Sequence, residues 1–354
     1  MMAPMEEDNA LVISLGVVAL NEELFLPDLL NDIRQQDYPH DLLEIILVDG
    51  GSDDETKNIM LQFAHNERSF RAVVVLDNPR RIQAAGWNRV IRAAAGDAVI
   101  RVDAHASLPV HFVSANAQTL MDGHDVCGGT RPTAVPKQDE TPWRETLHRA
   151  EESAFGSSVA DYRKALQPGY VTSVFHGAYR VAVFKDVGVF DERLVRTEDN
   201  DLHYRIRQRG YKIYFNPEIA SVQYVRGSLR KMLKQKYGNG YWIGRTLFVN
   251  PRCLQLYHFV PGVFVAACLI CAVVGLCASW WPLILLGVLY GVACIALGVK
   301  AVIGVKKKNM TMLVLPLVFC GIHVSYGVGT LLGIVRGLFG GLGDFDTSYT
   351  VKSS

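Results

Sequence analysis

The C-terminal third of this 354-residue chain contains two long stretches without a charged residue. They cover residues 259–299 and 311–335, whereas residues 1–252 carry nearly all of the 36 basic and 35 acidic side chains. A helix needs about 20 consecutive apolar residues to cross the hydrocarbon core of a bilayer. Three segments meet this requirement, at about Phe259–Ser279, Pro282–Val305 and Thr311–Val335. We therefore expect a polar N-terminal domain followed by a membrane region with about three transmembrane helices.

The loops between the apolar segments predict their orientation. The Trp-Trp-Pro turn at residues 280–282 is short, so the first two segments are expected to form a helical hairpin. Lysines 306–308 follow the second segment, and the positive-inside rule places this loop, and the domain before the hairpin, in the cytoplasm. The tail from about Gly337 would then lie on the outer side of the membrane, although the positive charge of Arg336 beside the third segment argues against this orientation. Buried core helices, or a third segment that re-enters or lies in the interface, are the alternatives.

The first 250 residues alternate between strand-like and helix-like segments. Apolar runs predict strands at residues 11–18, 44–48, 71–76 and 98–102. We expect one helix from about Glu22 and another over residues 82–95. Between them, a further helix should follow a turn at residues 49–52, with Ser52 or Asp53 as its cap. This order predicts an α/β fold with a mostly parallel, Rossmann-like sheet. We expect a domain over 1–252, with interfacial helices at 228–252, then a membrane region over 253–340 and a polar tail over 341–354.

A carboxylate follows the fourth predicted strand, where open α/β sheets bind their ligands. Asp103 opens the triplet Asp-Ala-His, and the first and third side chains of an extended triplet point the same way. Asp103 and His105 could therefore share one divalent metal ion. A metal ion there could hold a nucleotide diphosphate and stabilise it as a leaving group.

Other polar residues follow the first three predicted strands. Glu22, after the first strand, can reach a base or ribose, and Asp49, after the second, can accept hydrogen bonds from a uracil or a ribose hydroxyl. Arg80 and Arg81, near Asn88, could offset the charge of a diphosphate. Helix capping, a turn aspartate and two solvated arginines are the alternatives. The convergence of polar groups at three strand ends favours a ligand site.

Later segments add a candidate base and candidate positioning residues. Glu198 and Asp199 open a predicted helix, so their carboxylates either stabilise the helix start or remove a proton from a sugar hydroxyl. His176 is either structural or close to a ligand, which the following Gly177 would let approach. The basic, aromatic segment 230–242 reads as an interfacial amphipathic helix that could also help to close the donor site.

The ordered set of motifs resembles family 2 glycosyltransferases with the GT-A fold, in particular the bacterial membrane enzymes of succinoglycan biosynthesis. The resemblance extends over about residues 11–250. The matching segments are residues 21–22, 44–52, 101–106, 175–180, 188–192 and 198–202. It implies an inverting transferase that uses a nucleotide-sugar, a UDP-sugar. The apolar C-terminal segments would bring the site close to the bilayer, so we expect a polyprenyl-diphosphate-linked sugar as the acceptor, at the cytoplasmic face of a bacterial plasma membrane.

The resemblance also assigns roles to residues. Asp103 falls on the first aspartate of the family's D-x-D metal motif, His105 replaces the second, and Asp199 matches the catalytic base. An imidazole ligand favours Mn²⁺ over Mg²⁺. The expected donor-binding residues are Leu20, Glu22, Asp49, Gly50, Ser52, Arg81, Asn88 and Asp103. The expected acceptor- or diphosphate-binding residues are His176, Gly177, Arg180, Glu198, Gln235 and Trp242.

Two rival functions follow from the same residues. A processive synthase would carry Gln-x-x-Arg-Trp, but Gln235 is followed by a broken form of this motif and the spans are few. A catalytically silent membrane scaffold is disfavoured because Asp49, Asp103, His105 and Asp199 are all present. The balanced net charge of +1 gives no indication of a nucleic-acid partner.

Overall fold

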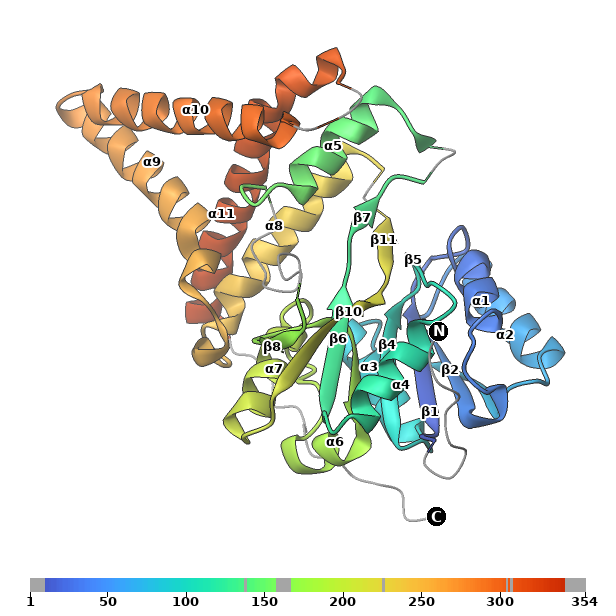
Figure 1. The fold of residues 1–354 in the computed structure, drawn as a ribbon. Helices are drawn as coiled ribbons and strands as arrows, with labels where there is room; N and C mark the ends of the chain where they lie inside the picture. The colour runs from blue at the N-terminus through green and yellow to red at the C-terminus, as the bar shows by residue number, and fades with distance from the viewer. Residues whose placement is uncertain are drawn as a thin grey trace. The chain divides into compact units, whose positions relative to one another are not determined.

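We analysed a computed structural model that describes residues 10–136, 139–156, 167–224, 227–303, 305 and 308–340 (Figure 1). The described chain divides into two compact units. The first unit takes its residues from 1–132 and 160–223, and the second from 133–159 and 224–344. By packing, the division therefore falls near residue 224 rather than at the expected 252, and a segment at 133–159 joins the C-terminal helices. Residues 306–307 and the polar tail at 341–354 lie outside the described residues.

Within the described residues, eight strands of the first unit form one sheet in the order β3-β2-β1-β4-β9-β6-β10-β8. Strands β1 to β4 are mutually parallel, β6 and β10 are parallel, and β9 is antiparallel to both β4 and β6. The predicted, mostly parallel sheet is confirmed. The strands are β1 (Ile13–Ala19), β2 (Leu43–Asp49), β3 (Ala72–Asp77), β4 (Ala98–Asp103), β6 (Val126–Thr130), β8 (Gly169–Val171), β9 (Phe175–Arg180) and β10 (Ile213–Ala220).

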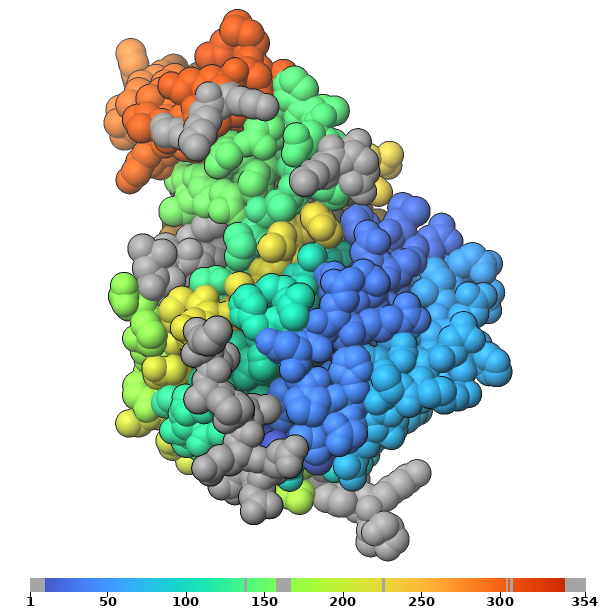
Figure 2. Space-filling view, turned by 45° about the vertical axis from the view of Figure 1, so that its right-hand side comes forward, coloured from blue at the N-terminus to red at the C-terminus, as the bar shows by residue number. Residues whose placement is uncertain are grey.

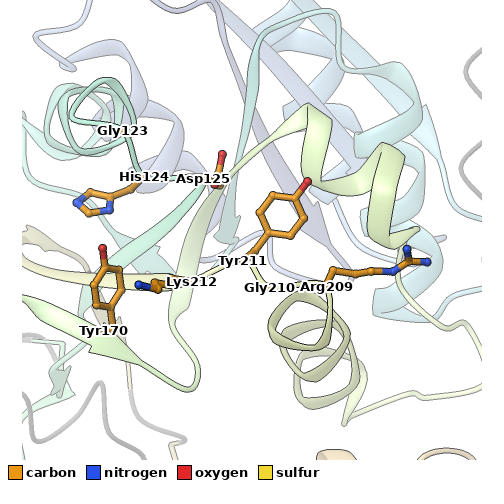
Figure 3. Close-up of a pocket in the computed structure, with 8 residues that line it drawn as sticks. All are labelled: Gly123, His124, Asp125, Tyr170, Arg209, Gly210, Tyr211 and Lys212. Carbon is orange, nitrogen blue, oxygen red and sulfur yellow. The ribbon is translucent and has the colours of Figure 1, made fainter.

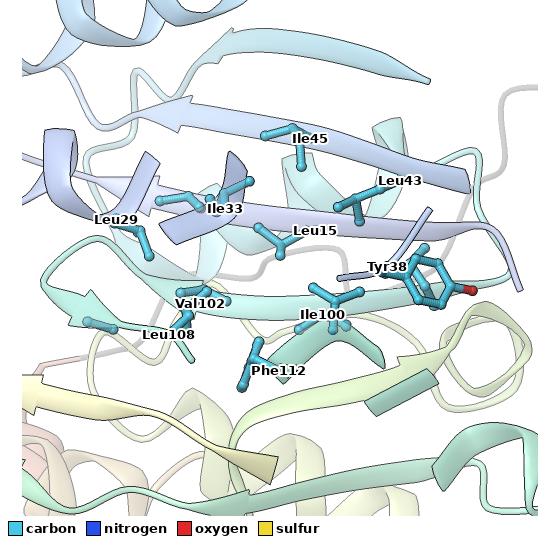
Figure 4. Close-up of a cluster of buried hydrophobic side chains, with 14 of the residues drawn as sticks. Leu15, Leu29, Ile33, Tyr38, Leu43, Ile45, Ile100, Val102, Leu108 and Phe112 are labelled. Carbon is cyan, nitrogen blue, oxygen red and sulfur yellow. The ribbon is translucent and has the colours of Figure 1, made fainter. Parts of the chain in front are cut away.

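Helices cover both faces of this sheet, which explains why its strands read as continuous apolar runs. Side chains alternate between two buried clusters: Ile45 packs with the cluster of Figure 4, and its neighbour Ile46 packs with the cluster on the other face. On the face in Figure 2, the blue to light-blue N-terminal elements form one packed surface. The helices of this unit are α1 (Leu26–Arg34), η2 (His40–Leu42), α2 (Thr56–Asn66), α3 (Gln83–Ala93), α4 (Phe112–Met121), α6 (Val181–Val187) and α7 (Glu198–Gln208).

Two local expectations near the sheet are wrong. The first helix begins at Leu26 rather than Glu22, because Pro27 occupies its first turn, where a missing N–H costs nothing. The second helix is not capped by Ser52 or Asp53: it begins at Thr56, whose N–H donates to Asp54 Oδ1 at 3.0 Å.

The second unit contains the apolar helices and two polar ones. Its elements are β7 (Thr133–Ala134), α5 (Pro142–Glu152), α8 (Leu229–Thr246), η5 (Pro251–Cys253), η6 (Leu256–Phe259), α9 (Val260–Cys277), α10 (Trp281–Val302), η7 (Met310–Val314) and α11 (Leu315–Phe339). Among the described residues, three segments are long and apolar enough to cross a membrane. They are Leu256–Cys277, Trp281–Val302 and Met310–Phe339.

Glycines bring α8 and α11 into backbone contact. A Cβ at Gly240 of α8 would lie 2.0 Å from the carbonyl oxygen of Tyr326, and a Cβ at Gly333 of α11 would lie 2.1 Å from that of Tyr241. Small residues allow helices to approach this closely. The two helices therefore form one rigid pair.

We predict that Gly333→Leu destabilises the protein by at least about 1–3 kcal/mol, because no side chain fits between the two backbones. Thermal unfolding in detergent measures the effect. Gly287→Leu is the matched control, since a Cβ at Gly287 of α10 meets no described atom within 4 Å. Equal melting temperatures for the two variants would contradict the observed packing.

Candidate active site

The loops after β1 and β2 are joined by hydrogen bonds at the carboxyl edge of the sheet. Ser52 Oγ accepts the N–H of Asn21 at 3.0 Å, and Asn21 Oδ1 accepts the N–H of Asp53 at 2.8 Å. The buried Asp49 carboxylate accepts the N–H groups of Gly51 and Ser52 at 3.1 and 3.2 Å. Asp49 therefore holds the turn, and its role toward a nucleoside stays a prediction, as do those of Leu20 and Gly50.

Asp103 is the last residue of β4, and a buried histidine fixes its backbone. The N–H of Asp103 donates to His176 Nε2 at 3.1 Å, and His176 Nδ1 lies 2.8 Å from Ser221 Oγ. Burial lowers the pKa of His176 to about 3, so the ring is neutral and its Nδ1–H donates to Ser221. His176 therefore positions Asp103, as a structural histidine would.

The Asp-Ala-His triplet is not extended, contrary to our expectation. Ala104 and His105 form a turn between β4 and the short strand β5 (Ala106–Ser107), which pairs with β11 (Val222–Tyr224). The turn places His105 Nδ1 3.1 Å from Glu22 Oε1 and His105 Nε2 3.1 Å from Gln223 Nε2. The carboxylate can only accept, so Nδ1 carries the proton and the lone pair of Nε2 accepts an N–H of the Gln223 amide.

A carboxylate and an imidazole are ligand types of divalent metal ions, and an ion bound at His105 Nε2 would replace the Gln223 amide there. A carboxylate that accepts the second N–H of a histidine is the usual support of a metal-binding imidazole, and Glu22 provides it for His105. Burial would raise the pKa of Asp103, but nearby positive charge, including that of Arg101 and Arg131, holds it below its ordinary value. Among the described residues no cluster of three or more His, Cys, Asp or Glu side chains is suited to a metal ion. Water and substrate oxygens would complete the coordination of Asp103 and His105.

The sequence reasoning missed Arg101, which lies two residues before Asp103 on β4. Its buried guanidinium forms an ion pair with Asp199 at the start of α7. The rings of Trp87 and Phe190 lie 4.5 and 4.6 Å from it. Burial opposes the charge of Arg101, yet the partner Asp199 raises its pKa. An arginine inside an apolar strand needs a buried partner, and this signal was present in the sequence.

Glu198, the neighbour of Asp199, is buried. Its Oε2 atom has no hydrogen-bond partner within the described part of the chain. Burial and then the charge of Asp199 raise the pKa of Glu198 to about 8. Glu198 therefore carries a proton at neutral pH.

We predict that Glu198→Gln removes part of the pH dependence of stability. The pKa of Glu198 in the folded protein is above its ordinary value of 4.5. Its contribution to the stability of the folded protein is therefore full below pH 4.5 and is lost as pH rises toward about 8. Glutamine does not ionise. The variant should therefore melt at a higher temperature than the wild type near pH 8 and at a similar temperature near pH 4.5. A constant difference across this range would show that Glu198 does not titrate there.

Other predicted residues have partners within the protein. Asn88 is fully buried, where its amide holds the backbone of Phe190 at 2.9 Å, and its role in the donor site stays a prediction. Arg180 pairs with Ala98 at the amino end of β4, away from Asp103, and its role toward a diphosphate stays a prediction. Gly177 makes room for the ring of Tyr179.

Three further residues keep their predicted roles as predictions. Arg81 is half-exposed and lies 3.2 Å from Asp53. Gln235 and Trp242 belong to α8 of the second unit.

Backbone strain gathers at the same edge. Within the described residues, the non-glycine residues with positive φ are Asn21 (56°), Arg81 (56°) and His176 (46°). Such conformations cluster at functional sites. By contrast, the pocket in Figure 3 lies at the amino ends of β6 and β10, between Asp125 and Lys212, and is remote from Asp103 along the strands.

A comparison with known protein families identifies the domain that contains this edge of the sheet. The model described as Glycosyl transferase family 2 matches residues 14–188, which include Asp49, Asp103 and His176. The chain carries a family 2 glycosyltransferase domain. Asp199, and the helix α7 that contains it, lie after the matched segment.

Relatives and a solved structure agree with this assignment. The chain is 26% identical to the succinoglycan biosynthesis protein ExoA of Rhizobium meliloti, over 82% of this chain and 86% of that protein. It is 25% identical to a dolichyl N-acetyl-α-D-glucosaminyl phosphate 3-β-D-2,3-diacetamido-2,3-dideoxy-β-D-glucuronosyltransferase of Methanococcus voltae. That match covers 92% of this chain and 98% of the Methanococcus voltae protein. The mannosyltransferase PcManGT of Pyrobaculum calidifontis, solved with GDP-Man and Mn²⁺, shares the fold, with a TM-score of 0.60, 17% identity and coverage of 91% and 88%.

Proposed function

We propose that this glycosyltransferase transfers a sugar, with inversion, from a UDP-sugar to a polyprenyl-diphosphate-linked acceptor at the membrane. The observation that carries the proposal is the arrangement along β4. Asp103 ends the strand, and Arg101, two residues earlier on the same face, holds Asp199. One strand thus brings a candidate metal ligand and a candidate base to the same edge. Relatives support the acceptor class, since their names include dolichyl and undecaprenyl phosphates.

The donor diphosphate would lie against Asp103 and His105. These residues would hold Mn²⁺ or Mg²⁺, and the ion supplies charge that stabilises the leaving diphosphate. Glu22 fixes the tautomer of His105 through the contact to Nδ1, and His176 fixes the backbone of Asp103. This assignment changes the role of Glu22 from a nucleoside contact to the support of a ligand.

Asp199 would act as the base. Arg101 Nη1 engages Oδ1, and we propose that Oδ2 accepts the proton of the acceptor hydroxyl. The hydroxyl oxygen forms a bond to the anomeric carbon as the bond from that carbon to the diphosphate oxygen breaks on the opposite face. The side chain of Asp199 is 31% exposed, which leaves access for an acceptor.

The location follows from the second unit. We propose that the catalytic domain lies in the cytoplasm of a bacterium and that the apolar helices hold it at the plasma membrane, where a polyprenyl-linked acceptor lies. A processive synthase is the alternative, and product length on a gel separates the two.

The decisive experiment measures nucleotide diphosphate release from a panel of UDP- and GDP-sugars, with Mn²⁺ or Mg²⁺ and a polyprenyl-diphosphate-sugar acceptor. We expect release from a UDP-sugar that depends on both metal and acceptor. Asp103→Asn should abolish release, whereas Asp77→Asn, an exposed carboxylate at the end of the neighbouring strand β3, should retain it. Release that needs no metal, or equal activity of the two variants, would overturn the site.

A further inference from the structure

The helix α11 differs from α9 and α10 in its surroundings. Of its apolar window, 39% is buried inside the protein, compared with 17% for Leu256–Cys277 and 11% for Trp281–Val302. The two helices of the hairpin thus have few fully buried residues, whereas one side of α11 is covered. What covers that side decides whether α11 can cross a bilayer.

Polar helices accompany α11 along its length. Its N-terminal part packs on α5, since Leu147 and Ala150 of α5 share a buried cluster with Leu315 and Phe319 of α11. In η7, just before α11, Thr311 Oγ1 lies 2.7 Å from Thr146 Oγ1 of α5. The rest of α11 runs beside α8. Gly321 of α11 faces Leu233, and Gly337 of α11 faces Phe248. At the rise of an α-helix, these two glycines are about 24 Å apart along α11.

These companion helices are unsuited to hydrocarbon. Exposed cations lie on α8, at Arg230, Lys231 and Lys234, and α5 carries the pair Arg149 and Glu145 at 2.7 Å. If α11 crossed the membrane, α8 would cross beside it with these cations, which is strongly unfavourable. An interfacial position avoids this burial, because the charged groups stay among water and lipid headgroups.

The ends of the hairpin formed by α9 and α10 give an independent indication that α11 stays on one side of the membrane. The start of α9 touches the middle of α11, since a Cβ at Gly327 would lie 2.3 Å from the carbonyl oxygen of Pro261. The end of α10 touches the start of α11, where a Cβ at Gly298 would lie 3.5 Å from Pro316. Figure 1 shows the result, with α9, α10 and α11 as three sides of a triangle. A hairpin enters and leaves on one side of a membrane, so α11 connects two points on that side.

The side of α11 that α5 and α8 leave open is apolar. Its exposed residues include Leu317, Val324, Leu332, Val335 and Leu338. A helix with one face on polar protein and one exposed apolar face matches the interfacial class.

We propose that α11 lies in the cytoplasmic lipid interface together with α8 and that only α9 and α10 cross the membrane. The chain then crosses twice, and residues 341–354 return to the side of the catalytic domain, rather than lying outside as first expected. Arg336, which a three-span arrangement leaves at the outer end, then faces the cytoplasm. The proposal rests on the cytoplasmic location of the catalytic domain and not on the reaction.

Protease protection in spheroplasts tests the proposal on the full chain. Three versions each carry one epitope tag, before Ala10, after Ser279 in the hairpin turn, or after Ser354. We expect external protease to remove only the tag after Ser279, and the other two only after permeabilisation. Removal of the tag after Ser354 from intact spheroplasts, or protection of all three tags, would overturn the proposal. Turnover of UDP-sugars by the tagged proteins is measured separately, so failure of the proposed function is distinguishable.

A second measurement avoids the tags. Val288 on α10 and Val324 on α11 are both exposed apolar residues, at 58% and 40%. We expect Val288→Lys to lower the amount of membrane-inserted protein several-fold, whereas Val324→Lys stays within about twofold of wild type because its ammonium can reach the headgroups. An equal loss for both variants would show that α11 crosses as α10 does.

Discussion

Asp199→Asn should lower the rate of sugar transfer by about 10²–10⁴-fold, the range for a lost general base. The amide keeps the size of the side chain but cannot take the proton of the acceptor hydroxyl. The Michaelis constant for the donor should stay near that of the wild type, because Asp103 and His105 are unchanged. Initial rates with the nucleotide-sugar and the lipid acceptor measure both quantities.

Asp186→Asn is the matched control. This exposed carboxylate on α6 pairs with Arg209 at 3.6 Å and lies outside the proposed site. If Asp199→Asn turns over within a few-fold of this control, Asp199 is not the base, and the buried Glu198 becomes the residue to test next.

Arg101→Met should reduce both stability and turnover. Removing one partner of a fully buried ion pair costs about 3–5 kcal/mol, and we expect the lower end because Asp199 is partly exposed. Without the guanidinium, Asp199 also loses the contact that orients it. Turnover should therefore fall while the Michaelis constant for the donor changes little. Urea unfolding in detergent and initial rates measure the two effects.

Two further variants separate charge from shape. Arg101→Lys keeps the charge but not the planar group that lies between Trp87 and Phe190, so it should fall between wild type and Arg101→Met. Arg209→Met removes an exposed cation and should change stability by about 0–1 kcal/mol. A wild-type rate for Arg101→Met would show that Asp199 needs no partner, or is not the base.

The sequence predicted the parallel core of the sheet because the pattern there is local. Four apolar runs, the first three each followed by a predicted helix, match β1 to β4 within one or two residues. Strand β9 was not predicted, because its antiparallel position between β4 and β6 depends on distant pairing. The same pairing places Arg180 at the amino end of β4.

At the site, the sequence identified chemical types but not contacts. Asp103, His105 and Asp199 were chosen by their positions after strands and at a helix start. The partners that give them their properties, Arg101 and Gln223, are close only in the folded chain. The full burial of Asn88 was not predicted, because nothing local distinguishes a buried amide from one that faces a ligand.

The sequence by itself determined the family motifs, the parallel sheet and the apolar character of the last third, since each is a property of neighbouring residues. Only the tertiary structure decided which side chains meet. It bent the Asp-Ala-His triplet into a turn, joined Arg101 to Asp199 across 98 positions of chain, and packed the polar α8 against the apolar α11. The reason is physical: periodicity and turn chemistry act over a few residues, whereas ion pairs and close helix packing depend on groups that only folding brings together.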